Sequence, residues 1–287
     1  MKKLISLLLS LVMVSALCVP AFAETEEVYT PVPAKDWNDL VKILANLNDG
    51  DKVEIDVAPS EYNIVRVNGN MAYISASNVE VKFVERDFWY DTALYEFDYA
   101  LFGVGGYNVT LDFGNSQLQS KKNAAIMVDG NACTIKNAEF FCCENNNGWG
   151  GGIWITNDDP DCNITDCTFY HCNAEYGGGI YIDSNNVTVS GCKFIDCKCT
   201  KEGADIYDNN EDSTVIGCRT THSRDDNAFA YVKKIESDCS FGWDGQELYL
   251  SSTISGGNIL IIAGVAAVAV ITVAAVVISK KKKKTVQ

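Results

Sequence analysis

A short strand motif returns along the chain at an almost constant spacing, and this repeat constrains the fold more than any other feature. Segments with Ile, or a residue in its place, on both sides of a variable residue stand at 126–128, 153–155, 180–182 and 206–208, at steps of 27, 27 and 26 residues. Short alternating strands with Gly or Asn turns and no helical period are typical of a β-solenoid. A propeller blade needs about 40 residues and does not fit this period. Because crossovers between parallel strands are almost always right-handed, we predict a right-handed parallel β-helix.

Glycine and asparagine mark the expected corners of each coil. Triple glycines at 150–152 and 177–179 precede the isoleucine strands, where a corner needs positive φ or the neighbouring coil leaves no room for a side chain. Asparagine, which tolerates the left-handed region, opens the following strand in four units. These residues are Asn78, Asn108, Asn163 and Asn186, of which the last three also form sequons that the repeat explains without glycosylation.

Eleven cysteines follow residue 23, and several keep the period of the repeat. We predict that Cys167, Cys192 and Cys218 form one buried row and that Phe169 and Phe194 form another, with neighbours about 4.8 Å apart. Small thiols suit such a core. Two alternatives stay open: some disulfides, which export permits, or a metal site, although the close CxxC pairs of zinc sites are missing.

Both ends of the chain carry membrane signals. Lys2 and Lys3, the apolar run after them and Ala21-Phe22-Ala23 fit a cleaved signal peptide. Ile259 to Ile278 is uncharged and about 30 Å long as a helix. Lys280 to Lys284 follow directly, which places them in the cytoplasm. We therefore expect an exported protein in the cell membrane, with its N-terminal ectodomain outside and one C-terminal transmembrane helix.

An open solenoid end exposes apolar side chains and unpaired backbone, so each end needs a cover. An amphipathic helix is predicted at 36–48, with Asp36 as its cap and Gly50 as its stop. Val53, Ile55 and Val57 should form the first strand, followed by roughly six coils of ~25 residues and a closing segment without the repeat. The predicted segments are a signal peptide at 1–23, an N-terminal segment with the capping helix at 24–70, β-helix repeats at 71–219, a C-terminal cap and stalk at 220–258, a transmembrane helix at 259–279 and a basic tail at 280–287.

The charge of the expected ectodomain excludes one class of partner. Residues 24–258 contain 16 basic and all 38 acidic side chains, a net charge of −22. Such a surface repels a phosphate backbone, so nucleic acid is excluded. The two histidines, His171 and His222, cannot supply a His-rich zinc site and leave little scope for His-based triads. The sequence indicates no catalytic residue, metal or cofactor.

Two motifs resemble a known family. Gly-Gly-Gly-Ile at 150–153 and 177–180, with Phe-x-x-Cys at 140–143, 169–172 and 194–197, resembles the GGAI and FxxN repeats of polymorphic outer-membrane proteins and adhesin-like right-handed β-helix proteins. The helix at 36–48 also looks like the N-terminal cap of that family. The resemblance covers about residues 35 to 220 and implies a surface protein, often adhesive. Cys replaces the family's Asn, and a C-terminal helix replaces the autotransporter barrel, so that export route is not implied.

Three aromatic residues are the candidate binding site. Trp154, Tyr181 and Tyr207 stand in the middle of the isoleucine strands, so they point outward if the isoleucines point inward. We expect an exposed aromatic stripe on which a sugar ring can stack. The alternative is that these rings only stabilise neighbouring coils. A second aromatic cluster, Phe88 to Tyr90 with Tyr95, Phe97 and Tyr99, interrupts the repeat as a rim loop or a hydrophobic lid.

Carboxylates raise two further possibilities. Asp158, Asp159 and Asp161 share one loop and Asp225-Asp226 another, and such oxygen ligands can hold Ca²⁺, but no loop has EF-hand or RTX spacing and a solvated acidic surface is the preferred interpretation. The β-helix fold also carries polysaccharide lyases and glycoside hydrolases, but the polygalacturonase-like Gly-His-Gly is missing. The leading hypothesis is adhesion or glycan binding at the cell surface. The alternatives are a polysaccharide-degrading enzyme and a purely structural envelope protein.

Overall fold

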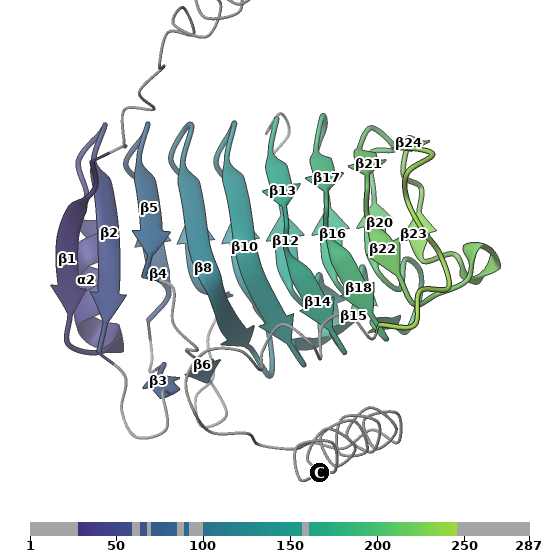
Figure 1. The fold of residues 1–287 in the computed structure, drawn as a ribbon, viewed down its shortest axis with the longest axis horizontal. Helices are drawn as coiled ribbons and strands as arrows, with labels where there is room; N and C mark the ends of the chain where they lie inside the picture. Colours follow the sequence, from purple (N-terminus) through teal and green to yellow (C-terminus); the bar gives the residue numbers. More distant parts are fainter. Residues whose placement is uncertain are drawn as a thin grey trace, which may run out of the picture. The chain divides into compact units, whose positions relative to one another are not determined.

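The computed structural model describes residues 28–58, 64–67, 70–84, 89–91, 100–156 and 161–245, and this part of the chain folds as a parallel β-solenoid. Figure 1 shows the strands side by side along one axis, coloured from purple to yellow-green in chain order. One α-helix, α2 (Trp37–Ala45), and a short 3₁₀ helix, η2 (Arg224–Asp226), occur among the described residues. The all-β solenoid that the repeat predicted is confirmed.

Three parallel sheets form the walls of the coil. Sheet A contains β1 (Thr30–Ala34), β2 (Lys52–Val57), β3 (Ile64–Arg66), β5 (Glu80–Phe83), β6 (Trp89–Asp91), β8 (Thr110–Gln119), β10 (Thr134–Phe141), β13 (Asn163–Thr165), β14 (Thr168–Tyr170), β17 (Thr188–Ser190), β18 (Lys193–Ile195), β21 (Thr214–Ile216), β22 (Arg219–Thr220) and β24 (Lys234–Ile235). Sheet B contains β4 (Ala72–Ile74), β7 (Ala100–Val104), β9 (Ala124–Val128), β12 (Ile153–Ile155), β16 (Ile180–Ile182), β20 (Ile206–Asp208) and β23 (Phe229–Ala230). Sheet C contains β11 (Glu144–Trp149), β15 (Asn173–Tyr176) and β19 (Lys198–Cys199). The seven described strands of sheet B correspond to about seven turns, one more than the period predicted.

The pairing of residues between coils confirms the register of the repeat. Ile153 pairs with Ile126 on one side and with Ile180 on the other, and Ile180 pairs in turn with Ile206. All four side chains are fully buried. The isoleucine strands therefore stack with their apolar side chains inside the coil, as alternation in a strand requires.

Left-handed backbone recurs at the same corners of successive coils. Residues with positive φ include Asn78, Asn108, Ala132, Asp161, Asn186 and Glu211 ahead of sheet A, Cys142, His171 and Asp196 ahead of sheet C, and Gly150, Gly177 and Gly203 ahead of sheet B. The glycines are required where they stand. A Cβ on Gly150 would lie 2.0 Å from the carbonyl oxygen of Ile153, and one on Gly177 would lie 2.1 Å from that of Ile180.

One corner prediction was wrong. Asn163 is the first residue of β13, as predicted, but it pairs with Thr188 and not with Asn186, so it does not take the left-handed corner. Asp161, with φ 43°, takes the left-handed position in that coil. Aspartate tolerates this region as asparagine does, so the Asn-Ile-Thr likeness placed the corner two residues too late.

The predicted phenylalanine row is confirmed and is longer than expected. Phe140, Phe169 and Phe194 are fully buried, and their rings stack almost parallel. Ring centroids are 4.6 Å apart between Phe140 and Phe169 and 4.9 Å apart between Phe169 and Phe194. This row lies in the interior of the coil, on the end of β10 and on β14 and β18 of sheet A.

The predicted cysteine row is confirmed as well. Cys167, Cys192 and Cys218 are fully buried on successive coils. Burial, followed by the contacts with the other two thiols, raises the pKa of Cys192. A second row consists of Cys143, Cys172 and Cys197, and a third pair of Cys133 and Cys162. All eleven cysteines of the described chain are free thiols, so the disulfide alternative finds no support.

Helix α2 covers the N-terminal end, at the left of Figure 1, as predicted. The Asp36 carboxylate accepts a hydrogen bond from the Asp39 amide at 2.9 Å, and the Trp37 ring packs edge-on against Phe102. The helix ends at Ala45 with Asn46 as its C-cap, earlier than Gly50 indicated. The strand at 52–57 is not the first: β1 precedes the helix and pairs with β2, a strand that the two prolines of β1 concealed.

Parallel pairing continues beyond residue 219, where the repeat was expected to stop. β23 pairs with β20, and β24 pairs with β21. The Cys239 thiol donates to the Val215 carbonyl at 3.5 Å, so the cysteine row is extended. Phe229 takes the position after Ile206 in the isoleucine row and packs edge-on against Phe194. The extension was missed because the chain reaches these positions in fewer residues than the period of the repeat.

Several predictions fall outside the described residues. These are the signal peptide at 1–23, the transmembrane helix at 259–279, the basic tail at 280–287, and Phe88, Tyr95, Phe97, Tyr99, Asp158 and Asp159. Within the described ranges, no helix has both the length and the apolar character needed to cross a membrane.

The phenylalanine row yields a stability prediction. Phe169→Ala should lower the free energy of unfolding by about 3–5 kcal/mol, because it leaves a cavity between two stacked rings. Tyr170→Ala, at the next, partly exposed position of the same strand, should cost clearly less. Denaturant unfolding followed by circular dichroism measures both, and equal losses would contradict the interior placement of Phe169.

Candidate functional site

The outward positions of sheet B carry one row of large side chains. Met127, Trp154, Tyr181 and Tyr207 pair in that order across four coils. The rings of Tyr181 and Tyr207 stack almost parallel with centroids 5.5 Å apart. The three predicted site residues are thus brought together in one row, on the outer side of the sheet.

A second row meets the first across the glycine corner. Trp149 and Tyr176 pair at the ends of β11 and β15, directly before the triple glycines. Ring centroids lie 5.5 Å apart between Trp149 and Trp154, 5.9 Å between Trp149 and Tyr181, and 4.9 Å between Tyr176 and Tyr207. Tyr231 closes the series against Tyr207 at 5.5 Å. We call these six residues, Trp149, Trp154, Tyr176, Tyr181, Tyr207 and Tyr231, the aromatic patch.

Exposure within the aromatic patch differs from the prediction. Tyr181 was expected on an exposed stripe, but it is only 7% exposed because Trp149 and Tyr207 pack against it. Trp154 and Tyr207 are half-buried. The most exposed members are Trp149, at 44%, and Tyr231, at 48%. Sequence reasoning missed Trp149 and Tyr176, although the signal was present: an aromatic residue precedes each glycine triple.

Carboxylates border the aromatic patch. The Glu202 carboxylate is hydrogen-bonded to the Tyr231 hydroxyl, which raises the pKa of that tyrosine. Burial, and then the charge of Asp183, raises the pKa of Tyr181 to about 12. Burial, and then Glu202, raises the pKa of Tyr207. These tyrosines therefore stay protonated at neutral pH, next to strong hydrogen-bond acceptors.

The aromatic patch combines apolar ring faces with acceptors at its edge. Ring faces suit the C–H surface of a pyranose, and carboxylates accept hydrogen bonds from its hydroxyls. Among the described residues, no three His, Cys, Asp or Glu side chains gather closely enough to hold a metal ion. The Asp226 carboxylate, one of the Ca²⁺ candidates, accepts the Ser223 amide at 2.7 Å and caps η2. The patch therefore offers apolar ring faces beside hydrogen-bond acceptors.

A buried polar cluster lies inside the last coils. Asp205 takes the position that Gly152 and Gly179 occupy in earlier coils, where a Cβ would meet the rings of Phe169 and Phe194. The residue next in row after Phe194 is Thr220. An aspartate–threonine pair thus replaces the glycine–phenylalanine pair of the earlier coils.

The Asp205 carboxylate is completely buried. One of its oxygens accepts the Thr220 hydroxyl at 2.5 Å, and the other has no hydrogen bond and lies 3.7 Å from His222 Nε2. Burial raises its pKa to about 7, against the opposing effects of Thr220 and His222. A carboxylate with such a pKa could act as a general acid only if substrate reached it, and Asp205 is fully shielded. The cluster is part of the interior and not an outer catalytic site.

The structure defines a parallel β-solenoid with an aromatic patch on its outer face. A sequence model of the right-handed β-helix region matches residues 63–234, more than half of the chain. The chain belongs to this family, and its coil is right-handed, as predicted. A comparison with curated proteins finds no match.

The raised pKa of Asp205 predicts how the free energy of unfolding depends on pH. Its folded pKa of about 7 lies above the unfolded value of about 3.9, so the folded state holds the proton more tightly. The stabilisation is complete below about pH 3.9 and is lost as the pH rises through about 7. Asp205→Asn should remove this loss and be more stable than the wild type at pH 8 by roughly 2–4 kcal/mol.

Denaturant unfolding between pH 4 and pH 8 measures this difference. Thr220→Val provides the matched control, because removing a hydroxyl that lowers the Asp205 pKa should move the loss of stability to higher pH. Parallel pH profiles for the wild type and Asp205→Asn would contradict the placement of this carboxylate.

Proposed function

We propose that this chain is a cell-surface β-helix protein that binds glycans through the aromatic patch. In this proposal residues 1–23 direct export, the helix at 259–279 anchors the chain in the cell membrane as a single-pass protein, and the ectodomain contacts extracellular glycans or another cell. The acidic composition, the terminal segments and the resemblance to adhesin-like repeats support this arrangement.

One observation carries the proposal: the exposed rings belong to a continuous series of contacts. Trp149 and Tyr231 are two of the five large hydrophobic residues that are exposed in the described chain, and both lie in the aromatic patch. A tryptophan that is 44% exposed contributes only part of its surface to the packing of the core. An exposed aromatic surface with polar neighbours is typical of a binding site. The buried Tyr181 beneath gives the exposed rings a rigid support.

No observation on the described residues specifically supports the enzyme alternative. Of the described carboxylates with shifted pKa, Asp205 is enclosed in the coil. The other three, Glu80, Asp212 and Asp226, are held by Lys52, Lys233 and Ser223 in that order. Asp208, also buried, accepts the Asp212 and Ser213 amides and the Ser213 hydroxyl. A glycoside hydrolase needs two carboxylates on either side of an accessible bond.

A glycan panel separates the three classes. The purified full-length protein is incubated with pectins, xylans and host glycans, and both retention and product formation are measured. We expect retention without turnover. Product formation would favour the enzyme, and neither outcome would favour a structural envelope protein.

The aromatic patch yields a mutational prediction. Trp149→Ala should weaken glycan retention about tenfold or more, since exposed aromatic residues often dominate binding energy, and should leave the melting midpoint little changed. Tyr181→Ala should lower the melting midpoint, because it removes a buried ring that stacks on Tyr207. Trp154→Ala, at a half-buried position, should reduce both.

Tyr107→Ala is the matched control, because Tyr107 is 58% exposed and lies outside the aromatic patch. It should alter neither property. Intact retention by Trp149→Ala together with a lowered melting midpoint would refute the binding assignment and leave the patch a purely structural stack.

A further inference from the structure

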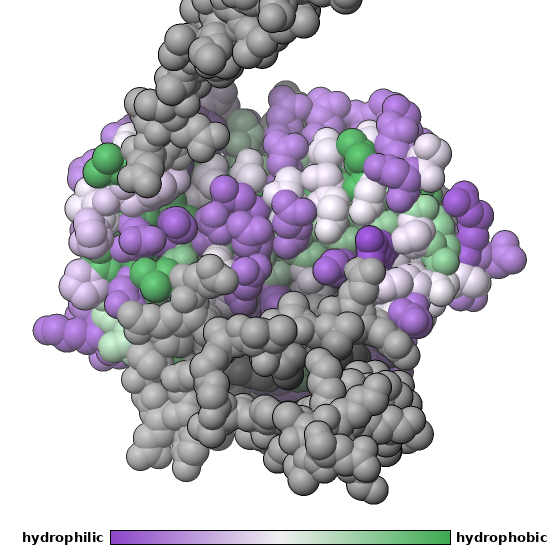
Figure 2. All heavy atoms as spheres, in the orientation of Figure 1, coloured by the Kyte–Doolittle hydropathy of each residue, from purple (hydrophilic) through white to green (hydrophobic). Residues whose placement is uncertain are grey.

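The outer face of sheet A differs from the aromatic patch in chemistry. Figure 2 shows this face with mainly hydrophilic and pale residues, and hydrophobic ones are scattered. In its N-terminal part, oppositely charged side chains alternate between coils: Lys52 lies 2.5 Å from Glu80, and Lys136 lies 3.3 Å from Asp112. These cross-strand pairs offset charge between neighbouring coils.

Hydroxyl and amide side chains form one row on the same face. One outward row runs through Thr110, Thr134, Asn163, Thr188 and Thr214 and ends at Lys234. Successive members are one coil apart, so their polar groups stand in line along the axis. The change from threonine to lysine occurs at the last strand of the sheet.

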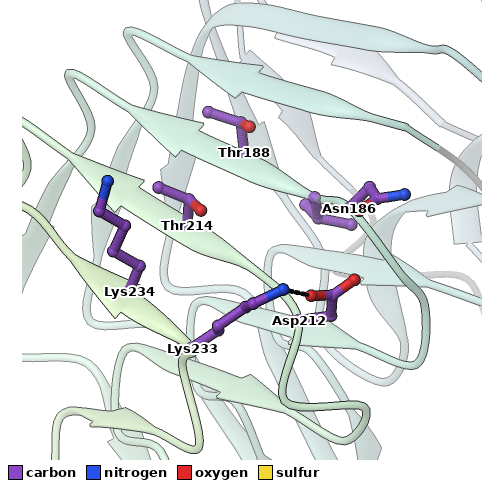
Figure 3. A pocket seen from close by; sticks show the side chains of 7 residues that line it. Asn186, Thr188, Asp212, Thr214, Lys233 and Lys234 are labelled. Atoms are coloured by element: carbon purple, nitrogen blue, oxygen red, sulfur yellow. Dashed lines mark hydrogen bonds and ion pairs between the residues drawn. The ribbon is translucent and has the colours of Figure 1, made fainter.

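A cavity of about 360 Å³ lies at this end of the row. Its lining comes from three successive coils and includes Asn186, Thr188, Asp212, Thr214, Lys233 and Lys234. Figure 3 shows Lys233 directed at Asp212, with Lys234 beside Thr214. The volume is at the lower end of the range for small-molecule sites, so one sugar unit suits it better than a long chain.

The lining holds more positive than negative charge. It contains two ammonium groups and one carboxylate, in an ectodomain whose sequence carries −22. Asp212 is occupied: it is hydrogen-bonded to Lys233, and the backbone of Asn186 also contacts it. Lys233 therefore serves mainly to fix the Asp212 corner of the cavity.

Lys234 is the lysine whose ion-pair partner, Glu236, can be replaced by a bound anion. It lies 2.6 Å from Glu236, and the two side chains are 62% and 36% exposed. An exposed ion pair of this kind contributes only about 0–1 kcal/mol. An anion that also bonds to the neighbouring Thr214 hydroxyl would compete with Glu236, because a charge-assisted hydrogen bond is stronger than a neutral one.

From these features we infer that the cavity is a second binding site, for a sugar unit that carries one carboxylate. Lys234 and Thr214 hold the carboxylate, while Thr188, Asn186 and the outer oxygen of Asp212 bond to the ring hydroxyls. This site is distinct from the aromatic patch, and its probes are single sugars rather than the polymers of the glycan panel. Its test is therefore independent of the proposed function.

Titration calorimetry on the full-length protein tests the inference. The probes are glucuronate, glucose and inorganic phosphate, because glucuronate differs from glucose only in its carboxylate and phosphate offers charge without a sugar ring. We expect glucuronate to bind about tenfold or more tightly than either other probe. Its affinity should fall between about 0.05 M and about 0.5 M salt, since exposed charges are screened.

Three variants locate the site. Lys234→Gln should weaken glucuronate binding about tenfold or more, and Thr214→Val should weaken it by a smaller factor. Lys198→Gln removes an exposed lysine on sheet C and should have no effect. Trp149→Ala should also keep glucuronate binding, even where it abolishes retention of neutral glycans.

Four outcomes would overturn the inference: equal binding of glucose and glucuronate, equal binding of phosphate, wild-type affinity in Lys234→Gln, or loss of glucuronate binding in Trp149→Ala. Unchanged melting midpoints of the variants ensure that a lost signal reports the site and not misfolding.

Discussion

The register between neighbouring coils is the constraint on which every other feature depends. Parallel hydrogen bonding is satisfied only if each coil follows the path of the previous one, and single left-handed residues at the corners fix that path. Most of them are not glycine, as Cys142, His171 and Asp196 show. Each such residue costs on the order of 1–3 kcal/mol, and this strain is offset by the interior rows that the same path brings into contact, such as Phe140, Phe169 and Phe194.

The same register that builds the interior also builds the outer surfaces. Alternation along a strand sends every second side chain outward. When the inward residues of successive coils are stacked, the outward residues next to them are stacked as well. Tyr181 and Tyr207 are brought together by the pairing of the strands that contain them, in which Ile180 lies next to Ile206. Thr188 and Thr214 are aligned by Val189 and Val215 in the same way. A solenoid thus presents ordered rows of one chemistry with little further cost, and the aromatic patch and the hydroxyl row are both of this kind.

Periodic features could be predicted from the sequence, and features that break the period could not. The isoleucine, phenylalanine and cysteine rows were found because their spacing reports contact directly. β1 was missed because two prolines conceal a strand whose pairing is visible only in three dimensions. The burial of Tyr181 was missed because Trp149, which covers it, lies on another sheet and meets it only through the bend at the glycine corner. The cavity at Lys234 was equally hidden, since Asn186, Asp212 and Lys234 become neighbours only when the coils close.

The thiol rows require that the chain folds before its cysteines are oxidised. Neighbouring cysteines such as Cys167 and Cys192 stand one coil apart, a spacing within the range that a disulfide bridges. In the folded coil these thiols are enclosed, and burial keeps the pKa of Cys192 high, so little reactive thiolate is present. In the unfolded chain the same thiols are open to oxidation and can pair at random. For the export proposed above, coil formation must therefore outpace oxidation of the thiols, which favours surroundings poor in oxidants.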